Sequence, residues 1–125
     1  MSQFMLTIAL ALGLGLGSVS SAYSACPVVD AKANDSTFGV AGAKQDAIDQ
    51  ASKVAIEGAQ EICGTMIAEK CKSASRGKCM VDADNTEYMG EAYSVRYCDL
   101  DKVAKEWTCV VRADVKCSNQ CVDKK

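Results

Sequence analysis

The most regular pattern in the chain is the alternation of apolar and polar side chains over residues 107–117. Odd-numbered positions there are apolar or cysteine, and even-numbered positions are mostly polar or charged. Successive side chains of a strand point to opposite faces, so this segment predicts a long strand with one buried and one solvated face. A second alternation, over 91–99, predicts a strand with Tyr93, Val95 and Tyr97 on one side.

Residues 43–71 show a different period. Their apolar positions recur in steps of three and four, and most of their charges fall on the opposite side. This spacing predicts a long amphipathic helix. The middle of its apolar stripe is small, at Ala51, Ala55 and Ala59, which lets the helix approach a sheet closely.

Turn residues and short apolar runs predict the remaining elements. These are a first strand over 27–33, a turn at 34–36, a loop over 72–78, a strand starting within 79–84, a turn or bulged connection over 85–90, and a polar connection over 99–105. Consecutive strands with short links favour antiparallel pairing. The chain therefore predicts an α+β fold in strand–helix–three-strand order, with one long helix packed on a small, mostly antiparallel sheet.

The N-terminus predicts export. Residues 4–17 form an apolar run and small residues follow, which is typical of a secretory signal peptide covering residues 1–24. Residues 25–125 then form a single domain, located in the periplasm or secreted. An uncleaved anchor is one alternative. Another is lipidation of Cys26, because residues 23–26 resemble a bacterial lipoprotein cleavage box, although Tyr23 stands where a leucine-like residue is usual.

The even number of cysteines in an exported chain predicts four structural disulfides. The eight residues are Cys26, Cys63, Cys71, Cys79, Cys98, Cys109, Cys117 and Cys121. No Cys-x-x-Cys pair is present, so zinc knuckles and thioredoxin-type redox chemistry are not expected.

Geometry restricts the pairing of these cysteines. Cys63 and Cys71 would be about 12 Å apart on one helix. Cys109 and Cys117 would be about 26 Å apart on one strand. A disulfide needs Cα atoms within about 7 Å, so neither pair is expected to form. We expect at least one bridge from Cys63 or Cys71 to Cys79, Cys109 or Cys117, which would lock the helix to the sheet. For Cys71, a bond to Cys79 is the second choice, and Cys26 is expected to bond to Cys98 or Cys121.

Composition excludes several kinds of chemistry. The chain has no histidine, which removes the Ser-His-Asp triad, the Cys-His dyad and histidine–metal sites. The net charge of −2 does not fit a nucleic-acid binder. The segment starting at Asp82 resembles the start of a calcium loop, but Glu87 stands in place of the turn glycine. We therefore assign no catalytic residue, metal or cofactor, and an enzymatic role is left open but not favoured.

One candidate surface is left. Lys72, Arg76 and Lys78 form a basic loop between two cysteines, and Tyr88 and Met89 are expected to be exposed in the next turn. The chain is thus interpreted as a disulfide-stapled binding or structural module without a membrane span after cleavage, whose partner is a protein or an anionic surface ligand. The alternatives are a small secreted enzyme or toxin, and a protease inhibitor presenting the loop at 71–79.

Overall fold

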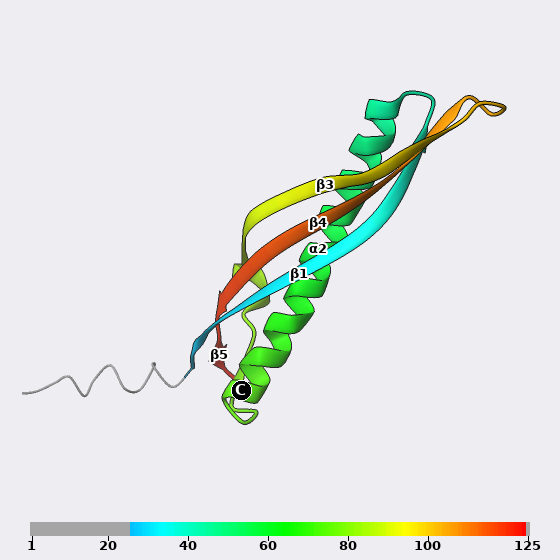
Figure 1. The fold of residues 1–125 in the computed structure, drawn as a ribbon. Coiled ribbons are helices and arrows are strands. Elements are labelled where there is room, and N and C mark those ends of the chain that lie inside the picture. The colour runs from blue at the N-terminus through cyan, green and yellow to red at the C-terminus, as the bar shows by residue number, and fades with distance from the viewer. Residues whose placement is uncertain (1–25, 125) are drawn as a thin grey trace, which may run out of the picture.

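The computed structural model describes residues 26–124, so the expected signal peptide over 1–24 lies outside the described residues. A long helix forms one layer and a twisted antiparallel sheet forms the other (Figure 1). The elements in chain order are β1 (Val28–Ala41), α2 (Lys44–Ala74), β2 (Cys79–Met80), the 3-10 turn η4 (Ala83–Asn85), β3 (Glu87–Asp101), β4 (Glu106–Gln120) and β5 (Val122–Asp123).

The sheet confirms the α+β expectation. Its strand order is β1-β4-β3, and both pairings are antiparallel. The helix α2 packs mainly over β1 and β4 and touches β3 at few points. Strand β2 is a two-residue strand outside this sheet, and it pairs with β5 beside the C-terminal end of α2.

Several boundaries differ from the expectation. Strand β3 begins within the connection expected over 85–90, so Tyr88 and Met89 lie in a strand and not in a turn, and it ends within the connection expected over 99–105. The turn expected at 34–36 is wrong, because β1 runs straight through it and pairs with β4 at every residue, including Asn34 with Asp114 and Ser36 with Arg112. Tertiary pairing here overrides the turn preference of these residues. The helix extends to Ala74, so the first three residues of the loop expected over 72–78 are helical. The strand expected over 79–84 ends at Met80.

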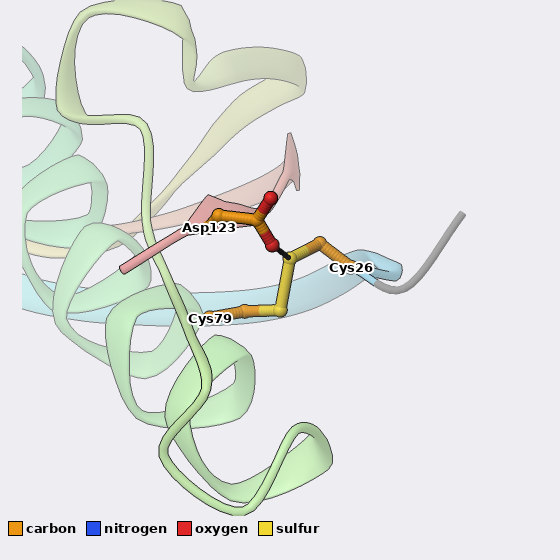
Figure 2. A group of neighbouring side chains, drawn as sticks. All are labelled: Cys26, Cys79 and Asp123. Atoms are coloured by element: carbon orange, nitrogen blue, oxygen red, sulfur yellow. Dashed lines mark hydrogen bonds between the residues drawn. A yellow bond between two sulfur atoms is a disulfide. The ribbon is translucent and has the colours of Figure 1, made fainter. Parts of the chain in front are cut away.

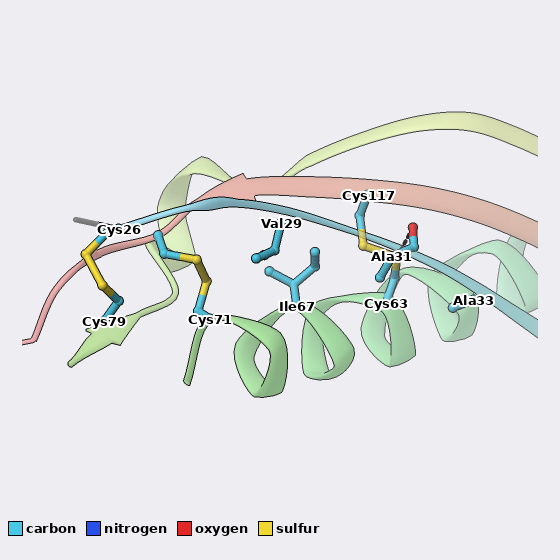
Figure 3. Packing of buried hydrophobic residues seen from close by; sticks show 10 residues of the cluster. Cys26, Val29, Ala31, Ala33, Cys63, Ile67, Cys71, Cys79 and Cys117 are labelled. Carbon is cyan, nitrogen blue, oxygen red and sulfur yellow. Dashed lines mark hydrogen bonds between the residues drawn. A yellow bond between two sulfur atoms is a disulfide. The ribbon is translucent and has the colours of Figure 1, made fainter. Parts of the chain in front are cut away.

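Small residues bring the two layers close together. Every fourth residue of α2 from Ala47 to Cys71 is fully buried, and most of these side chains are alanine or cysteine. Gly39 of β1 lies so close to the helix that a Cβ atom there would clash with the carbonyl oxygen of Ala47. The bulkiest buried helix residue is Ile67, which points toward Val29 of β1 between two disulfides (Figure 3).

The predicted bridge between the layers is confirmed. Cys63 of α2 is bonded to Cys117 of β4, with the Cα atoms 6.2 Å apart. As expected, Cys63 is not bonded to Cys71, nor Cys109 to Cys117.

The other pairing expectations were wrong. Cys71 is bonded to Cys121 and not to Cys79, because β4 continues past Cys117 and carries Cys121 back to the end of α2. Cys26 is bonded to Cys79. Lipidation of Cys26 requires a free thiol. The Cys26 sulfur is bonded to Cys79, so the disulfide-bonded chain has no free thiol at this position.

The fourth bond lies within the sheet. Cys98 and Cys109 are directly opposite on β3 and β4 and are joined by a disulfide, with their Cα atoms 4.0 Å apart. Every cysteine of the chain is therefore paired.

Candidate functional site

The residues expected to form one binding surface are exposed but do not lie together. Lys72, Arg76 and Lys78 lie at the C-terminal end of α2. Tyr88 stands opposite Cys117, on the face of the sheet that carries the helix, whereas Met89 stands opposite Lys116 on the outer face. The structure therefore divides the candidate surface into a basic turn and two separate strand positions.

The basic turn is compact. The amide of Gly77 donates to the carbonyl of Lys72 at 2.8 Å, and Arg76 and Gly77 both have left-handed backbone angles, φ 56° and 83°. This arrangement closes the helix in the manner of a C-terminal cap. A protease inhibitor would have to present an extended segment, so the geometry of this turn does not favour that reading.

One group of potential metal ligands lies near the N-terminal end of the domain (Figure 2). The Sγ of Cys26 is 3.2 Å from Oδ1 of Asp123, and Cys79 is adjacent. The two sulfurs are bonded to each other, so neither is a thiolate, the form that binds metals. A disulfide sulfur also has no proton to donate, so the contact is a close approach of sulfur and oxygen.

The outer face of the sheet carries an unusual row of side chains. Lys32 of β1 and Lys116 of β4 are directly opposite each other, and Met89 of β3 is opposite Lys116 on its other side. All three side chains are exposed. Like charges directly opposite on neighbouring strands destabilise a sheet, so this pairing has a local cost.

These residues line a hollow of about 560 Å³, which we call the lysine hollow. Lys70 joins them from α2, and its ammonium group donates to the carbonyl oxygen of Asp30. The Asp30 side chain is the one carboxylate among the lining residues. A neighbouring hollow of about 270 Å³ shares Lys32 and Lys116 and adds Arg112 together with Asp114, its salt-bridge partner.

The lysines of the hollow are not neutralised by ion pairs. Within residues 26–124, one salt bridge meets the usual distance, between Arg112 and Asp114 at 3.4 Å, and it involves none of the three lysines. The hollow is therefore lined by three lysines and a single acidic residue, in a chain whose net charge is negative.

Farther along the outer face lies an apolar row. Phe38 of β1 and Tyr97 of β3 both stand opposite Val110 of β4, and they are 65% and 56% exposed. The expectation that Tyr97 shares a face with Tyr93 is wrong, because a β-bulge between Val95 and Tyr97 shifts the register by one residue.

The other face of β3 is not covered by the helix. Tyr93 lies on the same face of the sheet as the helix, but it is 47% exposed because α2 lies mainly over β1 and β4. Trp107 of β4 is only partly exposed, and the ammonium of Lys44 lies 5.4 Å from the centre of its ring. That distance is within the range of a cation–π contact.

The lysine hollow could not be found by sequence reasoning, because it depends on the register of the strands. Lys32 and Lys116 are 84 positions apart and no local motif links them. The only sequence signal was that each occupies a polar position in an alternating segment.

Comparisons with models of known families, with curated proteins and with solved structures found no match to this chain. Within residues 26–124, α2 is too polar for a membrane crossing, and the structure has no other long helix.

Proposed function

We propose that this chain is an exported, disulfide-stabilised binding module that holds an anionic ligand in the lysine hollow on the outer face of its sheet. The four disulfides support export, because such bonds persist in oxidising compartments. The observation that carries the ligand assignment is the direct opposition of Lys32 and Lys116 at the hollow.

An anion would relieve the cost of this arrangement. A phosphate, sulfate or carboxylate group between Lys32 and Lys116 would replace a repulsion with two charge-assisted hydrogen bonds. Lys70 could contribute a third cationic group from the β1 edge. Met89 offers an apolar wall for the uncharged part of such a ligand.

A rigid platform supports this role. Strand β4 lies in the centre of the sheet, and Cys117, next to Lys116, is bonded to the helix. The backbone on which Lys116 stands is therefore fixed before a ligand arrives, which lowers the ordering cost of binding.

The test is retention of the oxidised mature chain on two columns at pH 7, one carrying sulfate groups and one carrying phosphate groups. We expect retention despite the negative net charge, and elution with salt because exposed charges are screened. The double variant Lys32→Gln/Lys116→Gln should bind the ligand groups about tenfold more weakly, since each exposed pair is worth about 0.7 kcal/mol.

Two double variants with the same change in charge serve as controls. Lys102→Gln/Lys105→Gln alters the turn between β3 and β4, which should leave retention unchanged. Lys72→Gln/Lys78→Gln alters the basic turn. If this last variant loses retention and Lys32→Gln/Lys116→Gln does not, the proposed site is wrong and the basic turn is the binding surface.

A further inference from the structure

Strand β1 is a free edge of the sheet. Its even-numbered residues direct their backbone groups away from β4, as two helix contacts show: the side chain of Gln50 accepts from the amide of Val40, and Lys70 donates to the carbonyl of Asp30. Between these two ends, the outward backbone groups of residues 32–38 form no hydrogen bond within the described part of the chain.

This edge lacks several of the usual protections. Natural sheets blunt their edges with proline, bulges, short strands, lysines and charges that point toward the core. Strand β1 has two of these devices, Lys32 and the helix-facing Asp35 beside Gly58. Strand β1 has 14 residues, no proline and a register with β4 that has no shift. The opposite edge, β3, has two register shifts and is therefore much less regular.

The helix flank beside this edge is polar at its two ends and apolar in its centre. The buried row of α2 runs every fourth residue from 47 to 71, so the residues one position earlier lie about 100° around the helix. This flanking row faces the β1 edge, as the contacts of Gln50 and Lys70 show. Its members are Asp46, Gln50, Val54, Gly58, Ile62, Met66 and Lys70.

The centre of the flanking row is apolar and uncovered. Val54 is 52% exposed, Ile62 is 42% exposed and Met66 is 37% exposed. An additional strand paired with β1 would lie below these side chains and cover them. The edge and the flanking row thus form one continuous surface with open hydrogen-bonding groups and open apolar area.

We propose that this surface binds a second copy of the chain, with the two β1 strands paired antiparallel about a two-fold axis. The two sheets would then join into one of six strands. Neighbouring strands of a sheet are about 4.8 Å apart. The helix α2 lies over both β1 and β4, so its axis is displaced from β1 toward β4 by about half of that distance. The two helices would therefore run side by side about 10 Å apart, the normal distance for packed helices.

Charge along the flanking row favours a second copy in this orientation. The row begins with Asp46 and ends with Lys70, with Gln50, three apolar residues and Gly58 between. A two-fold axis near Gly58 places Asp46 of each copy by Lys70 of the other. It also brings the two Asp35 carboxylates, which pack beside Gly58, toward each other, and this repulsion offsets part of the gain. A parallel arrangement would place like charges together at both ends of the row. A two-fold interface requires such a self-complementary surface.

This inference goes beyond the proposed ligand site and does not depend on it. Lys32 and Lys116 point to the outer face, away from the paired helices, so the dimer leaves them accessible. Lys70, which also lines the hollow, would lie by Asp46 of the second copy in the dimer. Dimerisation is measured without ligand, and its failure would leave the anion proposal standing.

The experiment is sedimentation equilibrium of the oxidised mature chain over a range of concentrations. We expect a dimer. Ser36→Pro removes one outward amide without touching the pairing with β4, and Ile62→Glu places a charge in the flanking row; each should raise the dimer dissociation constant at least tenfold. The matched control is Thr65→Glu, which adds the same charge on the solvent side of α2.

A second measurement keeps the test independent of folding. In the wild-type chain, the amides of Asn34 and Ser36 should become more protected from hydrogen exchange as protein concentration rises, while circular dichroism verifies that each variant is folded. The proposal is overturned if the chain stays monomeric at high concentration. It is equally overturned if folded Ser36→Pro and Ile62→Glu dimerise normally, or if the edge is covered only by added extended peptides.

Discussion

Cys63 and Cys71 lie on the same side of α2, and they are bonded to Cys117 and Cys121 at the end of β4. The helix and the strand are thus joined twice at neighbouring points. With either bond in place, the other closes a ring of only 14 residues, made of 63–71 and 117–121. The two bonds are therefore partly redundant.

Removing both bonds should cost more than the sum of the two single removals. Replacing Cys63 and Cys117 with alanine opens this ring of 14 residues and should lower the free energy of unfolding by about 3 kcal/mol. Replacing Cys71 and Cys121 should cost a similar amount. The remaining bond then closes a loop of about 50 residues, so its loss should cost about 4 kcal/mol. Urea denaturation of the two variants that each lack one bond, and of the variant that lacks both, measures these losses in the free energy of unfolding. A loss in the last variant equal to the sum of the other two would contradict the redundancy of the bonds.

Peptide mapping without reduction should give the connectivity directly. Trypsin separates Cys63 from Cys71 after Lys70, but Cys117 and Cys121 stay on one peptide. We expect that peptide linked to both helix peptides, with fragmentation assigning Cys63 to Cys117 and Cys71 to Cys121. A peptide linking Cys71 to Cys79 would contradict the fold.

Gly39 should be the glycine of β1 that tolerates no side chain. A Cβ atom there would clash with backbone atoms of α2, including the carbonyl oxygen of Ala47. Gly39→Ala should therefore lower the free energy of unfolding by about 1–3 kcal/mol. Gly42→Ala is the control, because a Cβ atom there meets nothing within 4 Å. Equal stability of the two variants would show that the layers are not so closely packed.

Asn119 should stabilise the segment between β2 and β3. Its side chain is 2% exposed, accepts from the amide of Asp82 at 3.1 Å, and donates to the carbonyl of Asp82 and the hydroxyl of Thr86, both at 2.9 Å. Asn119→Ala should cost about 2 kcal/mol, because the groups on Asp82 lose their hydrogen bonds. The exchange rate of the Asp82 amide should rise with it; an unchanged rate would rule out this role.

The sequence predicted the elements that have a long, regular pattern. The alternation around β4 and the period of α2 each reflect one buried face, and both elements are present. The turn expected at 34–36 failed because turn preference is local, whereas β4 offers pairing along all of β1. The exposure of Tyr93 could not be foreseen, because an apolar strand face is buried only where a helix lies over it.

The candidate site was less predictable than the fold. The basic residues at 72–78 were visible because they are neighbours in sequence. Lys32 and Lys116 become neighbours only through the register of β1 with β4, which no local pattern encodes. Likewise, the bulge that moves Tyr97 to the outer face depends on tertiary pairing.

The most direct test of the account is an NMR titration of the isotope-labelled mature chain with inorganic pyrophosphate at low salt. The proposed function predicts saturable shift changes centred on Lys32, Lys116 and Met89, which disappear in the variant Lys32→Gln/Lys116→Gln. Shift changes confined to residues 72–78, or changes that do not saturate at any site, would contradict the assignment of the lysine hollow as an anion-binding site.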